Sequence, residues 1–192
     1  KTTTLSSLRK SIIQKPEYLV NSISFEGIGV EAYQNSEIFI THFIDLLIKQ
    51  FKFQGKTKHI DFIEEYKEVK DFSQLGNFIT ELVSLEKTKM VLLIDEVDKS
   101  MNNQLFLDFL GMLRNKYLLR NDGQDFTFHS VILAGVHDIK TLKLKLRPDA
   151  EQKFNSPWNI AADFKVNMSF NPQEIATMLT DYVNYKGIKM DI

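Results

Sequence analysis

The chain has 192 residues, which is enough for one large domain or for one domain and the start of a second. Hydrophobic residues make up 43% of the chain, and its 24 basic residues balance 25 acidic ones, so a packed core can form without a global field that favours nucleic acid or an anionic membrane. The absence of cysteine excludes a disulfide scaffold, a thiolate zinc site and a cysteine nucleophile. No apolar run approaches the roughly 20 residues that span a bilayer, and no signal peptide is visible, so we expect a cytoplasmic protein.

The first residues, Lys1-Thr2-Thr3, lead directly into a predicted amphipathic helix, because apolar residues recur at helical spacing from Leu5 to Ile13. Lys-Thr before a helix is how a phosphate-binding P-loop ends. The glycines of such a loop would precede Lys1, so the chain shows half of the motif. We expect residues before Lys1 to exist and to contain a strand and a glycine-rich loop.

Residues 18–25 are predicted to form a strand, followed by a turn at two glycines. Ser36 is the expected N-cap of a deeply packed helix over residues 39–51. The polar segment 55–71 carries acidic residues and His59, a composition that also suits a metal site. Lysines alternate with these acids, which favours a solvated helix face.

After a helix over residues 74–87, Met90 to Ile94 form an apolar run that predicts a strand buried on both faces. It ends in Asp95 and Glu96. Hydrophobic residues followed by Asp-Glu are the Walker B pattern of P-loop ATPases, in which the Asp holds Mg²⁺ and the Glu orients the attacking water. The alternative is a buried strand that ends in a solvated acidic turn.

Asn102 or Asn103 can cap the next helix, whose apolar side is expected to extend to Tyr117. Residues 130–135 predict a second buried strand, with His137 at its carboxyl end. The periodicity of residues 140–147 does not decide between a short strand and an irregular helix.

Residues 164–169 alternate as in a half-exposed strand, and Asn171-Pro172-Gln173-Glu174 starts a final helix that stops at Gly187. Helices thus alternate with short apolar strands, which predicts an α/β three-layer P-loop fold with a mostly parallel sheet covered by helices. We assign residues 1–170 to this core, lacking its first strand and P-loop glycines, and residues 171–192 to the start of a helical lid or a linker.

Five stretches across the chain carry a family resemblance: residues 1–5, 24–29, 92–98, 130–138 and 155–161. With them the chain resembles P-loop ATPases of the AAA+/STAND group, and more narrowly the bacterial AAA-ATPase-like proteins that often carry a nuclease-like domain downstream. The strand ending at Gly135 departs from this pattern because it lacks the usual sensor Asn or Thr. The resemblance implies ATP and Mg²⁺ as cofactors, self-association and an attached C-terminal domain outside this chain. Neither a membrane nor nucleic acid is indicated as a partner.

The resemblance also implies roles for individual residues. Lys1, Thr2 and Thr3 would contact the nucleotide, Thr2 and Asp95 would bind Mg²⁺, and Glu96 would polarise the attacking water. The resemblance further suggests phosphate contacts by His137 and Arg147, with a turn cap as the alternative for His137. It places an arginine finger at Arg114 or Arg120, for which the alternative is a cation favoured by the helix dipole.

Three hypotheses for the function remain open at this point. The first is ATP binding and Mg²⁺-dependent hydrolysis that drive a conformational switch in an attached domain. The second is a degenerate P-loop scaffold that serves protein interaction or oligomerisation without turnover. The third, a small-molecule kinase, is disfavoured because such enzymes rarely need the Asp95–Glu96 pair. The intact pair favours the first hypothesis.

Overall fold

The computed structural model describes residues 2–66, 68–97, 103–135 and 170–188. The chain divides into two compact units, Lys1–Ala161 and Ala162–Ile192. The expected elements over residues 140–147 and 164–169 lie outside the described residues.

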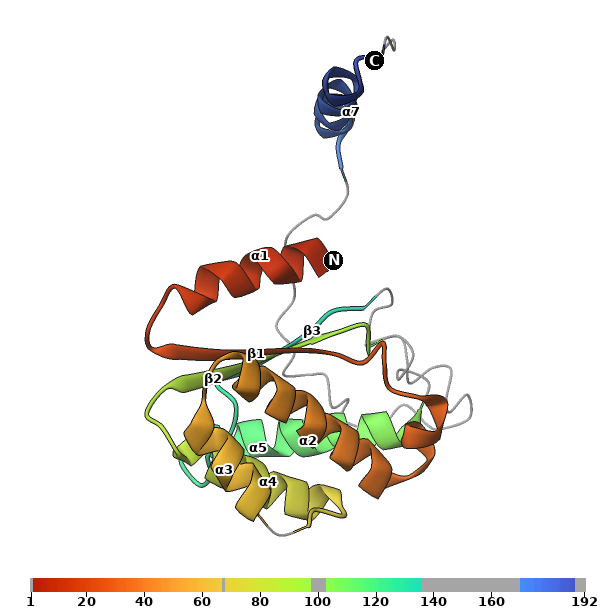
Figure 1. Ribbon diagram of the computed structural model, residues 1–192. Helices are drawn as coiled ribbons and strands as arrows, with labels where there is room; N and C mark the ends of the chain where they lie inside the picture. Colours follow the sequence, from red (N-terminus) through yellow and green to blue (C-terminus); the bar gives the residue numbers. More distant parts are fainter. Residues whose placement is uncertain (1, 67, 98–102, 136–169, 189–192) are drawn as a thin grey trace. The chain divides into compact units, whose positions relative to one another are not determined.

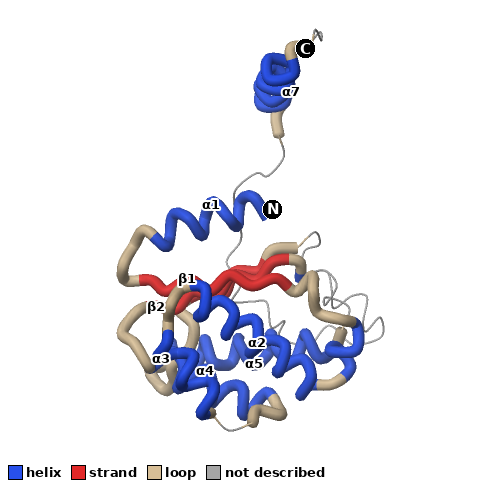
Figure 2. The backbone as a smooth tube through the Cα atoms, in the orientation of Figure 1, coloured by secondary structure: helices blue, strands red, loops and turns tan. Residues whose placement is uncertain are grey.

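The first unit is an α/β sandwich whose strands form one central layer. In chain order its elements are α1 (Thr2–Ile13), β1 (Tyr18–Ser24), a 3-10 helix (Val30–Gln34), α2 (Ser36–Phe53), α3 (Thr57–Glu65), α4 (Phe72–Ser84), β2 (Lys89–Asp95), α5 (Gln104–Asn121) and β3 (Ser130–Leu133). Helix α1 covers one face of the sheet, and α2 to α5 cover the other (Figure 1 and Figure 2). The predicted α/β three-layer fold is confirmed.

The three strands are parallel and lie in the order β1-β2-β3. Strand β2 is central, and its five residues Met90 to Ile94 are buried, as the continuous apolar run predicts. Strand β3 is shorter than expected and half-buried, because within the described part of the chain it pairs only with β2. The prediction of a second fully buried strand is therefore wrong for these residues.

The two faces of the sheet hold apolar clusters of very different size. On the α1 face, Leu5 packs with a small cluster of three strand residues, Val20, Val91 and Leu93. On the opposite face a large aromatic core surrounds Phe109 of α5, whose ring centroid lies 5.2 Å from that of Phe43 and 5.3 Å from that of Phe39. This core fixes α2, α4 and α5 as one layer.

The helix starts are set by asparagine and aspartate side chains. The Asn35 side chain, and not that of Ser36, caps α2 by accepting from the N–H groups of Glu37 and Ile38. The expected cap at Ser36 is thus wrong by one residue, because Asn35 has the extended backbone that an N-cap requires. Asn103 caps α5, as one of the two alternatives predicted.

The buried side of α5 contains a lysine that the apolar pattern does not predict. Lys116 is 4% exposed, whereas Tyr117, expected inside, is 36% exposed. The Lys116 ammonium donates to Asp125 Oδ2 and to Thr80 Oγ1, both at 2.6 Å, and the Thr80 hydroxyl donates to Asp125 Oδ1 at 2.7 Å. Burial opposes ionisation of Asp125, but hydrogen bonds from Lys116, Thr80 and the Phe126 N–H hold its pKa below the ordinary value. The network ties α5 to α4 and to the segment after α5.

Helix α3 exposes its charged residues, as predicted, and packs inward through a histidine. His59 is fully buried, and its ring stacks on Phe51 of α2 with the centroids 4.7 Å apart. Neither ring nitrogen has a hydrogen-bond partner in the described structure, and Nδ1 lies 3.9 Å from Glu86 Oε1. Burial lowers the pKa of His59, and Lys56 and Lys58 lower it further, against the opposing effect of Glu86. The His59 ring is therefore a packing group, and no cluster of three metal-ligating side chains forms around it among the described residues.

In the second unit, the described residues form α7 (Pro172–Lys186). The predicted helix start is confirmed: Asn171 and Glu174 form a reciprocal capping box, and Gly187 ends the helix in the left-handed conformation with φ of 64°. None of the helices that the structure describes in either unit is long and apolar enough to cross a membrane.

The first prediction concerns the buried ion pair. We expect Asp125→Asn to lower the free energy of unfolding by about 3 kcal/mol, because it leaves the buried Lys116 ammonium without a counter-charge. Urea unfolding followed by circular dichroism measures this loss. Asp122→Asn, at an exposed position three residues earlier, is the matched control and should change stability little. Equal losses in the two variants would contradict the role of the network.

The second prediction concerns the pH dependence of stability. Because the pKa of His59 is lower in the folded state than its ordinary value of 6.5, the unfolded chain binds the proton more readily. The stability contribution of the neutral ring is therefore complete above the ordinary pKa and is lost as the pH falls below it. We expect His59→Phe to reduce the difference in unfolding free energy between about pH 7.5 and pH 5.5. His42→Gln, at an exposed position, should leave that difference unchanged.

Candidate functional site

The carboxyl ends of the parallel strands meet at one edge of the sheet. Ser24, the last residue of β1, lies opposite Asp95, the last residue of β2, and the Phe25 N–H donates to the Asp95 carbonyl at 3.0 Å. On the other side of β2, the Val97 N–H donates to the Ala134 carbonyl at 3.2 Å. These two hydrogen bonds hold the backbone on both sides of Glu96. Open α/β sheets bind ligands at the end of the sheet where the carboxyl ends of the strands lie.

Glu96 has an unusual backbone conformation at the end of β2. Its φ of 55° makes it the one non-glycine residue with positive φ in the described part of the chain. The Glu96 N–H donates to Asp95 Oδ1 at 3.0 Å. The Asp95 carboxylate thus stabilises the backbone turn from which the Glu96 side chain extends. For a residue with a Cβ the left-handed conformation costs roughly 1–2 kcal/mol, and such strain is concentrated at functional sites.

A hollow of about 380 Å³ lies next to these strand ends. Its lining comes from α1, β1, α2 and the end of β2: Thr2, Leu5, Ser6, Arg9, Ser22, Gln50, Phe53 and Asp95. Thr2 is the first residue of α1, and Asp95 is the last residue of β2. The hollow therefore brings together the two residues that the sequence pairs as Mg²⁺ ligands, although they are far apart in the chain.

The donor atoms of these two residues fit a magnesium ion. The Thr2 hydroxyl and the Asp95 carboxylate are oxygen donors, and Mg²⁺ takes few protein ligands while it keeps water or phosphate oxygens. Asp95 Oδ1 is engaged with the Glu96 N–H, and Oδ2 has no hydrogen-bond partner among the described residues. Within these residues no group of three or more metal-ligating side chains could enclose an ion by itself. A site of this composition would need further ligands from water or from a bound substrate.

A family model described as "Predicted AAA-ATPase" matches residues 1–145. The chain belongs to this AAA-ATPase-like family. The match spans α1 to β3, and so it includes Thr2, Asp95 and Glu96. Comparison with curated proteins and with solved structures found no match.

None of the other predicted site residues that the structure describes in this AAA-ATPase-like chain lines the hollow. Thr3 is exposed on α1 and does not line it. Lys1, His137 and Arg147 lie outside the described residues. For the nucleotide contacts the structure therefore describes Thr2 and Thr3, of which only Thr2 borders the hollow.

The two arginine-finger candidates lie on α5 of the AAA-ATPase-like domain, and neither lines the hollow. Arg120 Nη1 donates to the carbonyl oxygens of Phe128 and His129, at 2.6 and 2.9 Å, so its guanidinium joins the end of α5 to the segment before β3. Arg114 is half-buried, and its Nε is enclosed without a hydrogen-bond partner among the described residues. The Arg120 guanidinium thus has hydrogen-bond partners within the domain, whereas the Arg114 Nε has none among the described residues.

Five residues of the hollow were not singled out by the sequence: Ser6, Arg9, Ser22, Gln50 and Phe53. Ser6 and Arg9 follow Thr2 at i+4 and i+7, so the helical period could have placed them on the same face. Gln50 and Phe53 come from α2, on the other side of the sheet. No local pattern indicates that they meet α1.

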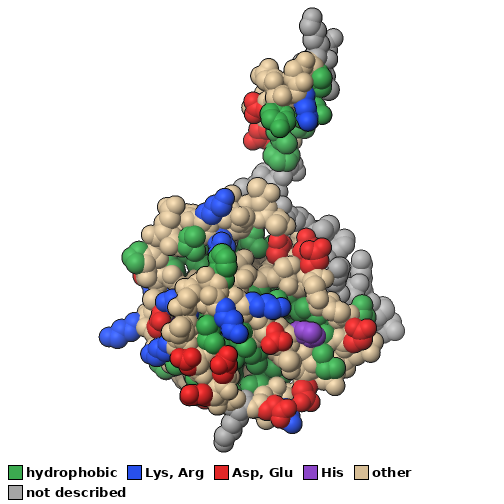
Figure 3. Space-filling model, viewed as in Figure 1, with side chains coloured by type: hydrophobic (Ala, Val, Ile, Leu, Met, Phe, Trp, Pro, Cys, Tyr) green, Lys and Arg blue, Asp and Glu red, His purple; other side chains and the backbone are tan. Residues whose placement is uncertain are grey.

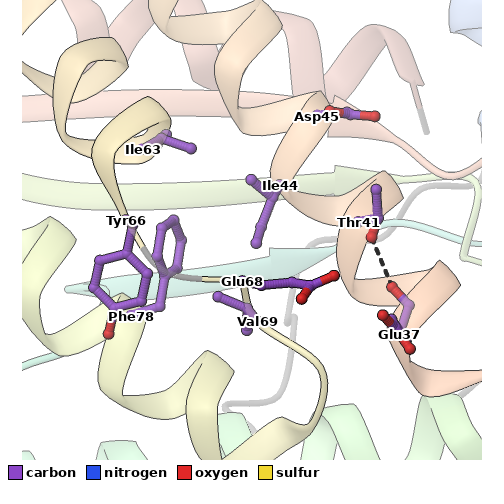
Figure 4. A pocket seen from close by; sticks show the side chains of 9 residues that line it. All are labelled: Glu37, Thr41, Ile44, Asp45, Ile63, Tyr66, Glu68, Val69 and Phe78. Carbon is purple, nitrogen blue, oxygen red and sulfur yellow. Dashed lines mark hydrogen bonds between the residues drawn. The ribbon is translucent and has the colours of Figure 1, made fainter.

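A second, smaller hollow of about 200 Å³ lies between α2 and the segment from α3 to α4 (Figure 4). Ile44, Ile63 and Phe78 give it apolar walls, and acidic side chains surround these walls. Lys70 pairs with Glu68 at 2.8 Å and lies 4.0 Å from Glu37, which neutralises part of this charge. None of the predicted site residues that the structure describes lines this hollow, so the candidate functional site of the AAA-ATPase-like domain is the one at the strand ends.

The backbone of Glu96 gives a third prediction. We expect Glu96→Gly to raise the free energy of unfolding by about 1 kcal/mol, because glycine adopts positive φ without the steric cost of a Cβ. Glu96→Ala removes the same carboxylate but keeps the Cβ, and it should show no such gain. Urea unfolding of both variants measures the difference. Equal stability of the two would mean that the turn stores no strain.

Proposed function

We propose that this chain binds ATP together with Mg²⁺ and hydrolyses it, and that hydrolysis drives a conformational change in an attached domain. The observation that carries the proposal is the hollow that Thr2 and Asp95 line together, with Glu96 directly after Asp95. Membership of the AAA-ATPase-like family supports nucleotide binding as the general activity.

The oxygen donors of the site would hold the nucleotide through its metal ion. Thr2 and Asp95 contribute one hydroxyl and one carboxylate, and Lys1 and Thr3 are proposed to contact phosphate oxygens next to them. Thr2 begins α1, whose first backbone N–H groups have no partner within the helix and favour an anion. When bound, Mg²⁺ would neutralise charge that develops on the β- and γ-phosphates.

Glu96 is proposed to orient and polarise the attacking water. The hydrogen bond from its N–H to Asp95 Oδ1 couples its backbone to the proposed metal ligand. A base that orients water must keep its position while the substrate binds, and the ties of Phe25 to Asp95 and of Val97 to Ala134 hold the chain on both sides. The strained turn thus has a function in this proposal: it fixes the direction of the catalytic residue.

The remaining contacts proposed for turnover are His137 and Arg147 at the phosphates and Arg114 toward an adjacent copy of the chain. Arg114 is the stronger of the two finger candidates, because the guanidinium of Arg120 is already bonded to two carbonyl groups. Residues 171–192, with α7 as their described part, are proposed to begin a helical lid or a linker to the domain that responds.

The fourth prediction tests this function. Glu96→Gln should keep ATP affinity but lower the steady-state rate of phosphate release at least about 100-fold, because the amide cannot accept the proton of water. Lys1→Ala and Asp95→Asn should instead weaken the binding of ATP in the presence of Mg²⁺. A fluorescent ATP analogue measures binding, and a phosphate assay measures turnover.

Glu64→Gln, at an exposed position on α3, is the matched control and should leave both quantities unchanged. Equal turnover in Glu96→Gln and the parent protein would contradict the role of Glu96. If an intact protein binds no ATP at all, the proposal is wrong and the alternative of a non-hydrolysing interaction scaffold replaces it.

A further inference from the structure

Aromatic and basic side chains lie together at the end of the sheet where the strands begin. Tyr18 is the first residue of β1, Lys89 is the first residue of β2, and His129 directly precedes β3. Because the three strands are parallel, these residues lie at the opposite end of the sheet from Asp95. None of the three lines either of the hollows described above. They are therefore separate from the proposed nucleotide site.

Rings and cations alternate through a continuous series of contacts at this end of the sheet. The Lys89 ammonium lies 5.7 Å from the centroid of the Tyr18 ring, and that centroid lies 5.6 Å from the centroid of the His129 ring. Arg120 Nη1 donates to the His129 carbonyl, and Arg120 Cζ lies 5.1 Å from the centroid of the Tyr117 ring. We call these five residues the amino-end patch.

The amino-end patch combines anchored side chains with accessible ones. Tyr18 is half-buried because it packs against the small apolar cluster under α1. Arg120 is half-buried and is fixed by the carbonyl groups of Phe128 and His129, while its Nη2 makes no hydrogen bond with a described residue. Lys89, Tyr117 and His129 are exposed. The anchored residues thus hold the patch in place and leave its ammonium group and two of its rings open to a ligand.

The charge of the amino-end patch is positive. Neither Lys89 nor Arg120 has an ion pair with a described residue, and the neighbouring acids Glu17 and Asp122 are exposed without pairing with them. Burial lowers the pKa of His129, and the charges of Arg120 and Lys89 lower it further, so its ring is neutral near pH 7. Figure 3 shows Lys and Arg side chains at the left of the first unit, the side on which β1 begins in Figure 1.

An alternation of rings and cations suits a strand of nucleic acid. Each base offers a flat face that stacks on an aromatic side chain, and each phosphate attracts Lys or Arg. An acidic peptide would match the cations but would leave the exposed rings of His129 and Tyr117 unused. A duplex would keep its base faces covered by the neighbouring bases.

We infer that the amino-end patch binds single-stranded nucleic acid, with His129 and Tyr117 stacking on bases and Lys89 and Arg120 contacting phosphates. This surface lies at the end of the sheet away from the proposed ATP site, so the inference does not depend on ATP turnover.

The fifth prediction tests this surface with the full chain and a fluorescent oligo-dT probe of about 12 nucleotides. Lys89→Gln should weaken binding at least about 5-fold at low salt, and it should reduce the slope of log affinity against log salt by about 0.7, because one phosphate contact is lost. His129→Ala should weaken binding about 10-fold without changing that slope, because it removes a stacked base and no charge. Fluorescence anisotropy measures both quantities.

Lys49→Gln and His42→Ala are the matched controls. They make the same two changes at exposed positions of α2, on the face of the sheet opposite to α1, and should leave affinity and slope unchanged. Tyr18 and Arg120 are kept, because both also stabilise the fold. All variants are checked for native circular dichroism. Probe binding is measured without ATP, which separates this test from that of the ATPase.

Three results would overturn the inference. The first is that the parent protein binds neither oligo-dT nor oligo-rU at low salt. The second is equal affinity of the parent, Lys89→Gln and His129→Ala for the probe, which would place the contact on another surface. The third is that a poly-glutamate peptide of equal charge displaces the probe as well as unlabelled oligo-dT does, while His129→Ala has no effect. That result would identify an acidic protein segment as the partner.

Discussion

The parallel pairing of β1 with β2 is the constraint on which the rest of the domain depends. Its register, from Tyr18 opposite Lys89 to Ser24 opposite Asp95, decides which side chains face α1 and which face the aromatic core. A slip by one residue would exchange the two faces and place Ile23 on the side of α1. The same register brings the end of β1 beside Asp95, so the packing of the core and the geometry of the site are determined by one set of hydrogen bonds.

The sequence predicts the elements that depend on local chemistry. The run from Met90 to Ile94 is apolar at every position, and a strand buried on both faces is its simplest outcome. The Asn171 and Glu174 pair starts α7 because two side chains satisfy two backbone N–H groups within one turn. The position of Asp95 follows in the same way, since it ends the apolar run and therefore lies where the carboxyl ends of the parallel strands meet.

Features that need a distant partner could not be read from the sequence. Lys116 lies at a buried position of α5 although its side chain is charged, because Asp125 and Thr80 bind its ammonium group. From the sequence, His59 resembles a surface residue because acidic residues surround it. In the structure, Phe51 of the preceding helix stacks on its ring. The hollow combines Thr2 with Gln50 and Asp95, and only the folded sheet shows that these residues share a surface.

The unequal apolar clusters on the two faces have a consequence for how the site is assembled. Leu5 is the one residue of α1 that is buried, so release of this helix from the sheet exposes little apolar surface. Asp95 belongs to a strand that is held by the whole aromatic layer. Local unfolding should therefore begin at α1, which carries Thr2, and leave Asp95 in place. A ligand that binds both Thr2 and Asp95 would link the weakly packed helix α1 to the firmly packed sheet. Because such a ligand binds only when α1 is docked, it would stabilise the docked position of α1.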